Sequence, residues 1–235
     1  RIETFTLIGT DLYNSCACSG ATSYAIKQDG TPQSCGDNRD GQLGNGTNGG
    51  TITTFADMQT SVKFKKLSGN GDGNEDQNVF FVIGLSVDGY AYACGRHRYG
   101  ALGLGATTQV NVFTKINDTV YEDIATGQNA TYLLKPNGKI DACGLEYWGQ
   151  LGTGRYGNDE EGNILYRNTP TEINDGDTYS AIFPSRGDTF FAINAQDHLK
   201  SCGMNLDAQL GYPAGVAGFN AQFFAQIGIK VVQRF

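Results

Sequence analysis

The sequence is poor in residues that bind metals and carry acid–base catalysis, since only two histidines, His97 and His198, occur in 235 residues. They lie far apart, and neither has the spacing of a metal site or of a catalytic triad. We expect both to be solvated or hydrogen-bonded turn histidines. No glycine-rich stretch ends in the Gly-Lys-Ser/Thr of a phosphate-binding loop. The sequence therefore predicts no catalytic residues, no metal site and no cofactor, and we expect a protein that is not an enzyme.

Long apolar runs and an excess of basic residues are also absent. No run of about 18 apolar residues occurs, so we expect no membrane span. No signal peptide is visible in a sequence that begins with Arg1. Lysine and arginine number 17 against 24 aspartates and glutamates, which gives a net charge of −7. Because phosphate binding requires clustered basic side chains, nucleic acid is not expected as a partner.

Helical periodicity is missing as well. No window keeps apolar residues at the i, i+3, i+4 and i+7 positions for more than a turn or two. The 33 glycines disfavour long helices, because glycine is about 1 kcal/mol worse than alanine in a helix interior. The sequence therefore predicts an all-β fold.

What the sequence does contain is a ten-residue block that occurs four times without a gap. The copies are CGDNRDGQLG from Cys35, CGRHRYGALG from Cys94, CGLEYWGQLG from Cys143 and CGMNLDAQLG from Cys202. The cysteines are 59, 49 and 59 positions apart (94 − 35, 143 − 94, 202 − 143). This period lies near the roughly 40 to 50 residues of a β-propeller blade.

Each unit also contains a predicted hairpin before its cysteine. The dipeptides Asp29-Gly30, Asp88-Gly89 and Asn137-Gly138 are typical of two-residue turns with positive φ at both positions, and Gln196-Asp197 is a degraded fourth copy. Strand-like segments flank each turn, a third apolar segment lies upstream, and a fourth follows each Leu-Gly. Four short strands per unit, repeated radially, indicate a β-propeller.

The repeat, an apolar strand, Asp/Asn-Gly, a short strand and then X-Gly-X-Asn-X-X-Gly-Gln-Leu-Gly, resembles that of the regulator of chromosome condensation family. The resemblance covers nearly the whole chain and implies a propeller that is usually closed by seven blades. Two departures stand out. Cysteine occupies the place where family members commonly have tryptophan, and the asparagine survives only as Asn38 and Asn205.

The expected organisation is four complete repeats with partial units at the ends. We place the repeats at about residues 9–58, 62–116, 119–173 and 177–227, with a partial unit at 228–235. Ile2 to Ile8 resemble the last strand of a preceding unit, and Lys230 to Phe235 the first strand of a following one. We favour a segment of a larger, seven-bladed ring over a small ring that closes by pairing its terminal strands.

The six cysteines are expected to be reduced. Equivalent points on neighbouring blades should lie about 10 Å or more apart, beyond the roughly 7 Å Cα limit for a disulfide. We therefore interpret Cys35, Cys94, Cys143 and Cys202 as small buried residues in the family's tryptophan slot. Cys16 and Cys18 lie two apart on one strand, and without a matching histidine a zinc site is not expected.

The loops differ most between repeats. An insertion of 8 residues falls near Asn70 to Asn78, because 22 positions separate Leu67 from Gly89 (89 − 67) against 14 from Cys16 to Gly30 (30 − 16). A second insertion falls near Arg155 to Leu165. Both are acidic and polar, and drift in tolerant surface loops would also explain them.

The residues inside the ten-residue block recur on one rim of the propeller. The second and third copies bring aromatic and arginine side chains, which dominate protein interfaces, into adjacent blades. The candidate partner-binding residues are Arg96, Arg98, Tyr99, Tyr147 and Trp148. Aromatic side chains folded inward over the blade edge are the alternative.

Three functions fit these observations. Our first interpretation is a non-catalytic protein–protein interaction module or scaffold in a larger assembly such as a virion, fibre, adhesin or multidomain protein. The family resemblance implies guanine-nucleotide exchange on a small GTPase as the alternative, and a secreted protein inhibitor is a third. Fold alone does not select among them.

Overall fold

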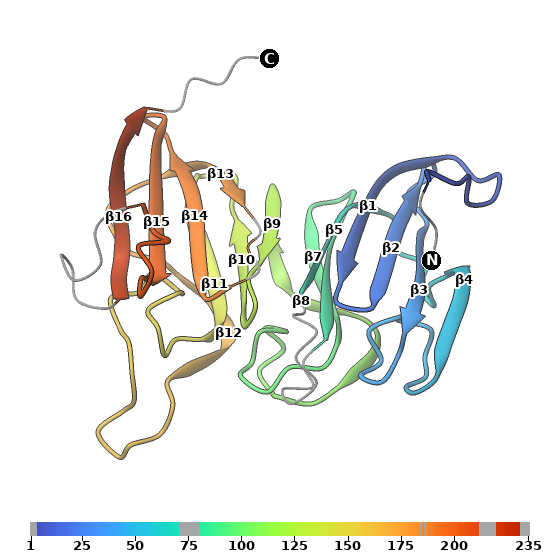
Figure 1. Cartoon of the computed structure of the whole chain (residues 1–235), viewed down its shortest axis with the longest axis horizontal. Coiled ribbons are helices and arrows are strands. Elements are labelled where there is room, and N and C mark those ends of the chain that lie inside the picture. Colours follow the sequence, from blue (N-terminus) through green and yellow to red (C-terminus); the bar gives the residue numbers. More distant parts are fainter. Residues whose placement is uncertain (1–3, 71–79, 184, 186, 212–219, 231–235) are drawn as a thin grey trace.

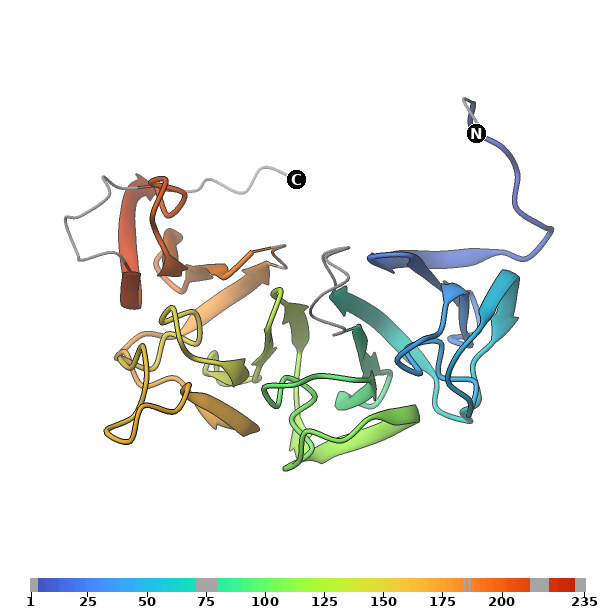
Figure 2. The same ribbon diagram turned by 60° about the horizontal axis from the view of Figure 1, so that its bottom comes forward.

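The fold is an open arc of four antiparallel sheets. The structure is a computed structural model that describes residues 4–70, 80–183, 185, 187–211 and 220–230. Figure 2 shows the sheets following one another along the arc, from blue at one end to red at the other. All regular elements in these described residues are strands. The predicted all-β propeller fold is therefore confirmed, and closure by seven blades stays a prediction.

Each sheet is one blade of four consecutive strands. Blade 1 contains β1 (Tyr13–Ser19), β2 (Thr22–Lys27), β3 (Pro32–Asp37) and β4 (Thr51–Asp57). Blade 2 contains β5 (Phe64–Asn70), β6 (Phe81–Ser86), β7 (Tyr90–Gly95) and β8 (Val110–Val120). Blade 3 contains β9 (Asp123–Thr126), β10 (Ala130–Leu134), β11 (Ile140–Leu145) and β12 (Tyr166–Glu172). Blade 4 contains β13 (Tyr179–Phe183), β14 (Thr189–Asn194), β15 (His198–Met204) and β16 (Asn220–Lys230).

The first strands of the blades, β1, β5, β9 and β13, lie on the inner side of the arc, and the fourth strands lie on its outer rim (Figure 2). Residues 4–8, which belong to the predicted N-terminal end strand, form no strand. Residues 2 and 3 lie outside the described residues, and so do residues 231–235 of the predicted C-terminal end strand, which stays a prediction.

The hydrophobic core lies between the blades. One buried cluster joins blades 1 and 2 through Tyr24, Phe64 and Phe113, and a second joins blades 2 and 3 through Phe81 and Ile124. The third joins blades 3 and 4, where the rings of Tyr132 and Phe190 stack with centroids 3.4 Å apart. A single blade is too thin to bury both faces, so each one depends on its neighbours for stability.

The glycine after each repeat cysteine is a structural requirement. Gly36, Gly95, Gly144 and Gly203 have φ of 110°, 109°, 117° and 109°. A Cβ atom at these positions would collide with the backbone carbonyl of the residue before the second strand, which is Ala21, Phe80, Asn129 or Asp188. Only glycine combines this φ with so close an approach of two strands.

The hairpin turns occur where expected, but the expected turn type is wrong. Gly30, Gly89 and Gly138 have φ of 84°, 85° and 78°, whereas the preceding Asp or Asn does not have positive φ. In the first blade Gly30 N donates to Lys27 O at 2.9 Å, and Lys27 N donates to Thr31 O. This is a three-residue loop with one left-handed residue, which accommodates the strand twist with a single glycine. Asp197, φ 63°, takes the glycine's place in the degraded copy.

The repeat cysteines join neighbouring blades. All six cysteines are free thiols, and Cys94, Cys143 and Cys202 are fully buried. Each of these three donates its thiol to a carbonyl in the Gly-X-Leu-Gly turn of the blade before it. The acceptors are Gly41 O at 3.2 Å, Ala101 O at 3.6 Å and Gln150 O at 3.2 Å. Within the described residues no blade precedes that of Cys35, which is partly exposed, so the expectation that all four are buried is wrong for this copy.

Candidate functional site

The long connections between strands collect at one end of the blades. The segments after β3, β7 and β11, residues 38–50, 96–109 and 146–165, lie along the lower edge of Figure 1. The shorter connections from β9 to β10 and from β13 to β14 reach the same end. We call this surface the loop face. The opposite end carries the tight turns between the second and third strands.

A pocket of about 210 Å³ opens on the loop face where blades 2, 3 and 4 meet. Its walls combine aromatic, aliphatic and amide side chains with one carboxylate. They are Tyr99, Gln128, Asn129, Leu145, Tyr147, Trp148, Ile164 and Asp188. The pocket therefore has the mixture of apolar surface and few polar groups that is typical of binding sites.

The aromatic wall has a defined geometry. The rings of Tyr147 and Trp148 are perpendicular, with centroids 4.8 Å apart, and both side chains are half-buried. On the other side, Tyr99 of blade 2 lies 6.3 Å from the ring of Tyr166 in β12. The edge-to-face pair of Tyr147 and Trp148 is of a kind that adds about 0.5 to 1.5 kcal/mol beyond area burial, whereas the rings of Tyr99 and Tyr166 are tilted.

Hydrogen bonds fix the backbone under Trp148. Its N–H donates to Gln150 Oε1 at 2.8 Å. The Nε2 of Gln150 donates to Asp188 Oδ1 at 3.2 Å, and Asn129 Nδ2 donates to the same oxygen at 3.2 Å. The carboxylate of blade 4 therefore connects two polar side chains of blade 3 at the base of the pocket. These hydrogen bonds between blades 3 and 4 restrict the side chains at the base of the pocket before any partner arrives.

His97 binds the backbone of Tyr99, which lines the pocket. Its Nδ1 accepts hydrogen bonds from Tyr99 N at 3.0 Å and Ala101 N at 3.3 Å, so the proton of the neutral ring is on Nε2. The side chain is fully buried. Burial lowers the pKa of His97 to about 4, and the neighbouring Asn129 side chain opposes this shift in part. His97 is thus a hydrogen-bonded turn histidine and is not solvated.

The residues at the position of His97 in the other blades also accept hydrogen bonds within this loop. Asn38 Oδ1 accepts a hydrogen bond from Leu43 N at 3.0 Å, and Asn205 Oδ1 accepts one from Leu210 N at 3.0 Å. In blade 3 the position is Glu146, which is buried and accepts from Arg167 Nε at 3.2 Å and from Thr153 Oγ1. Each blade therefore has a buried acceptor inside this loop, although the residue type changes.

The second insertion forms an acidic hairpin next to the pocket. Asn158 and Ile164 pair as an isolated bridge, and Ile164 also lines the pocket. At the tip, Asp159 Oδ1 accepts hydrogen bonds from Glu161 N at 3.0 Å and Asn163 N at 2.7 Å. The hydrogen bonds from Asn163 lower the pKa of Asp159. The hairpin thus carries negative charge at its tip, while its residue Ile164 lines the pocket.

The first insertion arises at the same end of the molecule. Asn70 ends β5, and its side-chain amide donates to Gln128 O beside the pocket. The rest of the predicted insertion, residues 71–78, lies outside the described residues. Both insertions therefore leave the strands at the loop face.

Three of the five predicted partner-binding residues come together in the pocket, and two do not. Tyr99, Tyr147 and Trp148 line it. Arg96 is exposed and pairs with Asp40 of blade 1 at 3.8 Å, and Arg98 is exposed outside the lining. The prediction missed Asn129 and Asp188, which precede the second strands of blades 3 and 4. The signal was a change at that position from Ala21 and Phe80 to polar residues.

The described residues contain no cluster of three or more His, Cys, Asp or Glu side chains that could hold a metal ion. In the same part of the chain, no helix is long and apolar enough to cross a bilayer.

No protein-family model matches the chain, but curated relatives and solved structures do. The chain is 30% identical over 122 residues to the secretion-regulating guanine nucleotide exchange factor of Bos taurus, a match that covers 50% of this chain and 25% of that protein. It is 28% identical over 142 residues to the ultraviolet-B receptor UVR8 of Arabidopsis thaliana, covering 59% and 30%. The chain thus spans less than a third of each relative's length.

Two solved structures share the fold over almost the whole chain. Human WBSCR16 has a TM-score of 0.76 at 20% identity, covering 99% of this chain and 56% of that one. Prp20p from Saccharomyces cerevisiae, whose structure was described with its binding properties to Gsp1p and histones, has a TM-score of 0.71 at 16% identity and covers 97% and 52%. These comparisons confirm the resemblance to the regulator of chromosome condensation repeat.

The comparisons also correct our first functional interpretation. A non-catalytic scaffold in a larger assembly is contradicted by the similarity to a guanine nucleotide exchange factor. They favour the alternative that we derived from the family resemblance. The inhibitor hypothesis and the expected absence of nucleic acid as a partner stay untested predictions.

Proposed function

We propose that this chain is part of a guanine-nucleotide exchange factor for a small GTPase, and that the pocket on its loop face contacts the GTPase. The similarity to the secretion-regulating guanine nucleotide exchange factor over 122 residues is the observation that carries the proposal. The fold shared with Prp20p agrees with it.

Exchange of this kind requires a protein surface and no covalent chemistry. A factor that binds the nucleotide-free GTPase more tightly than the GDP-bound form weakens GDP binding by the same ratio, because coupling between two ligands is reciprocal. Each tenfold weakening of GDP corresponds to about 1.4 kcal/mol of such preferential binding. The nucleotide and its magnesium ion belong to the GTPase, so the factor itself needs no cofactor.

The pocket is suited to anchor a protein partner. Its half-buried Tyr147 and Trp148 offer large apolar surfaces that lose little side-chain entropy on binding, and buried aromatic anchors carry much of the energy of interfaces. The hydrogen bonds through Gln150 and Asp188 hold the backbone of Trp148 in place. A preorganised surface spends less of its binding energy on ordering.

Charge indicates the kind of GTPase surface that fits. The chain carries a net charge of −7, and the Asp159 hairpin lies beside the pocket. A partner surface with basic residues around an apolar centre would complement it and would be attracted at long range. The association rate should therefore fall as salt increases.

The test is release of fluorescent GDP from a panel of purified small GTPases, measured with and without the protein that contains this chain. Accelerated release from at least one GTPase, together with tighter binding of its nucleotide-free form, is the expected result. If no GTPase in the panel releases GDP faster and none binds when nucleotide-free, the proposal is wrong. Val87→Ala is the matched control for pocket variants, because Val87 is an exposed apolar residue at the end of blade 2 opposite the loop face.

A further inference from the structure

The pocket on the loop face has one charged side chain among the described residues that line it. This is Asp188 of blade 4, and the remaining walls are aromatic, aliphatic or amide side chains. A ligand that enters the pocket therefore meets a negative charge next to apolar ring surface. Such walls favour a positively charged group and disfavour a phosphate or a carboxylate.

The carboxylate of Asp188 is held in position by amides of blade 3. Gln150 Nε2 and Asn129 Nδ2 both donate to its Oδ1 at 3.2 Å. These donors are neutral, so they orient the carboxylate without cancelling its charge. Asp188 is half-buried, and an ion pair formed in such a place is screened less by salt than one on an open surface.

The aromatic walls add a second attraction for a cation. The rings of Tyr147 and Trp148 are perpendicular, and blade 2 contributes the ring of Tyr99. A cation within about 6 Å of a ring centroid is attracted by the electrons of the ring face, and arginine is found in this arrangement more often than lysine. The pocket thus combines ring faces with a carboxylate.

The chain binds a cation with the same two kinds of group elsewhere. On blade 2, Lys115 Nζ lies 3.6 Å from the centroid of the Tyr90 ring and 2.6 Å from Asp118 Oδ1. The ammonium is therefore attracted by a ring face and a carboxylate at once. The pocket offers these two groups on a surface that a partner can reach.

We propose that the pocket binds the guanidinium group of an arginine side chain on the protein partner. Asp188 accepts N–H groups of the guanidinium, and the rings of Tyr99 and Trp148 cover its faces. The pocket volume of about 210 Å³ is roughly seven times the share of one water molecule in the liquid, which admits one side chain and no larger segment. That the partner is a small GTPase rests on the proposed function, whereas the chemistry of the pocket does not.

Arginine fits these walls better than the other cationic side chains. Its guanidinium is planar, stacks on aromatic rings and directs two parallel N–H groups at a carboxylate. The ammonium of lysine is a compact, strongly hydrated charge that does not stack. A trimethylated lysine fits an aromatic cage but has no N–H group for Asp188. These differences allow an experiment to distinguish the three cations.

The first test uses the fluorescence of Trp148, the only tryptophan of these 235 residues. The protein is titrated with the N-acetyl methylamides of arginine, citrulline, lysine and trimethyllysine at constant ionic strength. Arginine should change the fluorescence saturably, with half-saturation at about 1 to 10 mM, as expected for a ligand of one side chain. Citrulline, which has a similar shape without the charge, should bind at least about 10-fold more weakly.

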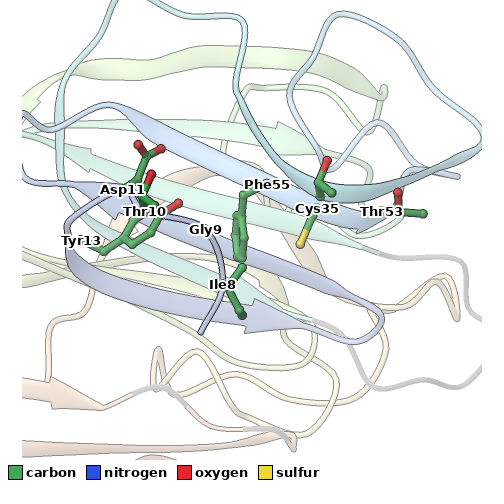
Figure 3. Close-up of a pocket in the computed structure, with 9 residues that line it drawn as sticks. Ile8, Gly9, Thr10, Asp11, Tyr13, Cys35, Thr53 and Phe55 are labelled. Atoms are coloured by element: carbon green, nitrogen blue, oxygen red, sulfur yellow. The ribbon is translucent and has the colours of Figure 1, made fainter. Parts of the chain in front are cut away.

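A matched pair of variants tests the carboxylate. Asp188→Asn removes the charge, keeps the shape and should weaken arginine binding at least about 10-fold. Asp11→Asn is the control, because Asp11 lies in a second pocket, on blade 1, which Tyr13 and Phe55 also line (Figure 3). This variant makes the same change in net charge next to aromatic rings and should leave the titration unchanged.

A second pair tests the ring. Tyr99→Leu should weaken arginine binding about 3-fold or more, whereas Tyr99→Phe, which keeps the ring face, should bind as the wild type does. Both variants leave the amide hydrogen bonds of Asp188 intact. They therefore decide the case if Asp188→Asn does not fold.

The second test connects the pocket with the GTPase. Where the protein accelerates GDP release, N-acetylarginine methylamide should slow that release at the concentrations that saturate Trp148, and the citrulline compound should not. Arginine binding that leaves exchange unaffected would overturn the assignment to the GTPase. If no GTPase responds, the proposed function fails, while the titration still decides whether the pocket binds arginine.

Three results of the titration would overturn the inference. The first is the absence of a saturable change with arginine. The second is binding of citrulline, lysine or trimethyllysine as tight as that of arginine. The third is equal binding of arginine by Asp188→Asn and Asp11→Asn.

Discussion

The thiol of Cys202 lies 3.2 Å from the carbonyl oxygen of Gln150, which belongs to the turn of the preceding blade. The same carbonyl accepts the hydroxyl of Tyr132 at 2.7 Å, so strands of blades 3 and 4 share one acceptor. Burial raises the pKa of Cys202 well above its usual value, which keeps the thiol protonated and able to donate. The repeated cysteine is therefore an interblade contact, and this role explains its recurrence.

Replacing Cys202 by alanine should lower the free energy of unfolding by roughly 1 to 2 kcal/mol, because a buried sulfur and its hydrogen bond are lost. Urea denaturation measures the change. Cys18→Ala is the control, since Cys18 is exposed on β1 and its loss should change stability by less than about 0.5 kcal/mol. Equal effects of the two substitutions would contradict the interblade role.

The buried ion pair of blade 3 gives a second prediction. Glu146 is 1% exposed, and Arg167 Nε donates to it at 3.2 Å. Arg167→Ala should cost about 3 to 5 kcal/mol, because the carboxylate stays buried without its cation. Adding Glu146→Asn, the residue that Asn38 and Asn205 supply in blades 1 and 4, should recover much of the loss. A double variant no more stable than Arg167→Ala alone would argue against this account.

The left-handed conformation of Ala208 in blade 4 gives a third prediction. Ala208 has φ 59°, at the position where Gly41, Gly100 and Gly149 have φ of 74°, 75° and 75°. A left-handed conformation costs a non-glycine residue about 1 kcal/mol. Ala208→Gly should therefore raise the free energy of unfolding by about 0.5 to 1 kcal/mol. Ala101→Gly, at a neighbouring position of blade 2 without positive φ, should instead destabilise, and thermal unfolding would distinguish the two.

Much of the fold could be predicted because the information is local. Glycine after each cysteine, Asp-Gly before it and short apolar strands all follow from backbone sterics within one repeat. The turn type escaped prediction because Asp29-Gly30 is compatible with more than one hairpin loop, and the number of loop residues with positive φ depends on strand register.

The site was harder to predict, because it is formed between blades. Tyr99, Tyr147 and Trp148 could be selected as adjacent aromatic residues of one rim. Asp188 could not, since its contact with Gln150 joins positions 38 residues apart in different blades. Arg96 was grouped with the aromatic residues but does not line the pocket, and the sequence does not reveal its ion pair with Asp40 of blade 1.

The buried histidine predicts a specific pH dependence. The pKa of His97 is about 4 in the folded protein, below its ordinary value of about 6.5. Folding therefore favours the neutral ring, and its stabilising contribution is complete above about pH 6.5 and declines as the pH falls toward 4. At pH 4.5 the free energy of unfolding should be lower than at pH 7 by roughly 2.5 kcal/mol because His97 becomes protonated more readily in the unfolded chain.

His97→Asn should remove that loss, since asparagine accepts the same kind of loop hydrogen bond in blades 1 and 4. Urea denaturation at pH 7 and pH 4.5 measures the difference for wild type and variant. His198→Asn is the control, because it retains the buried ring of His97. The free energy of unfolding of this variant should therefore depend on pH as that of the wild type does. If His97→Asn and wild type lose the same stability between the two pH values, the assignment to His97 fails.

The pocket predicts a loss of partner binding without a loss of fold. Trp148→Ala removes the larger ring of the perpendicular pair with Tyr147, while the backbone N–H that donates to Gln150 remains. Because the side chain is half-buried, stability should fall by less than about 1 kcal/mol. Affinity for the nucleotide-free GTPase should fall about 30-fold or more, as expected for a central aromatic anchor. Val87→Ala should change neither. If the wild-type protein accelerates GDP release and Trp148→Ala does so equally well, the GTPase contact lies elsewhere. The wild-type assay therefore tests the activity, and the variant tests the location of the site.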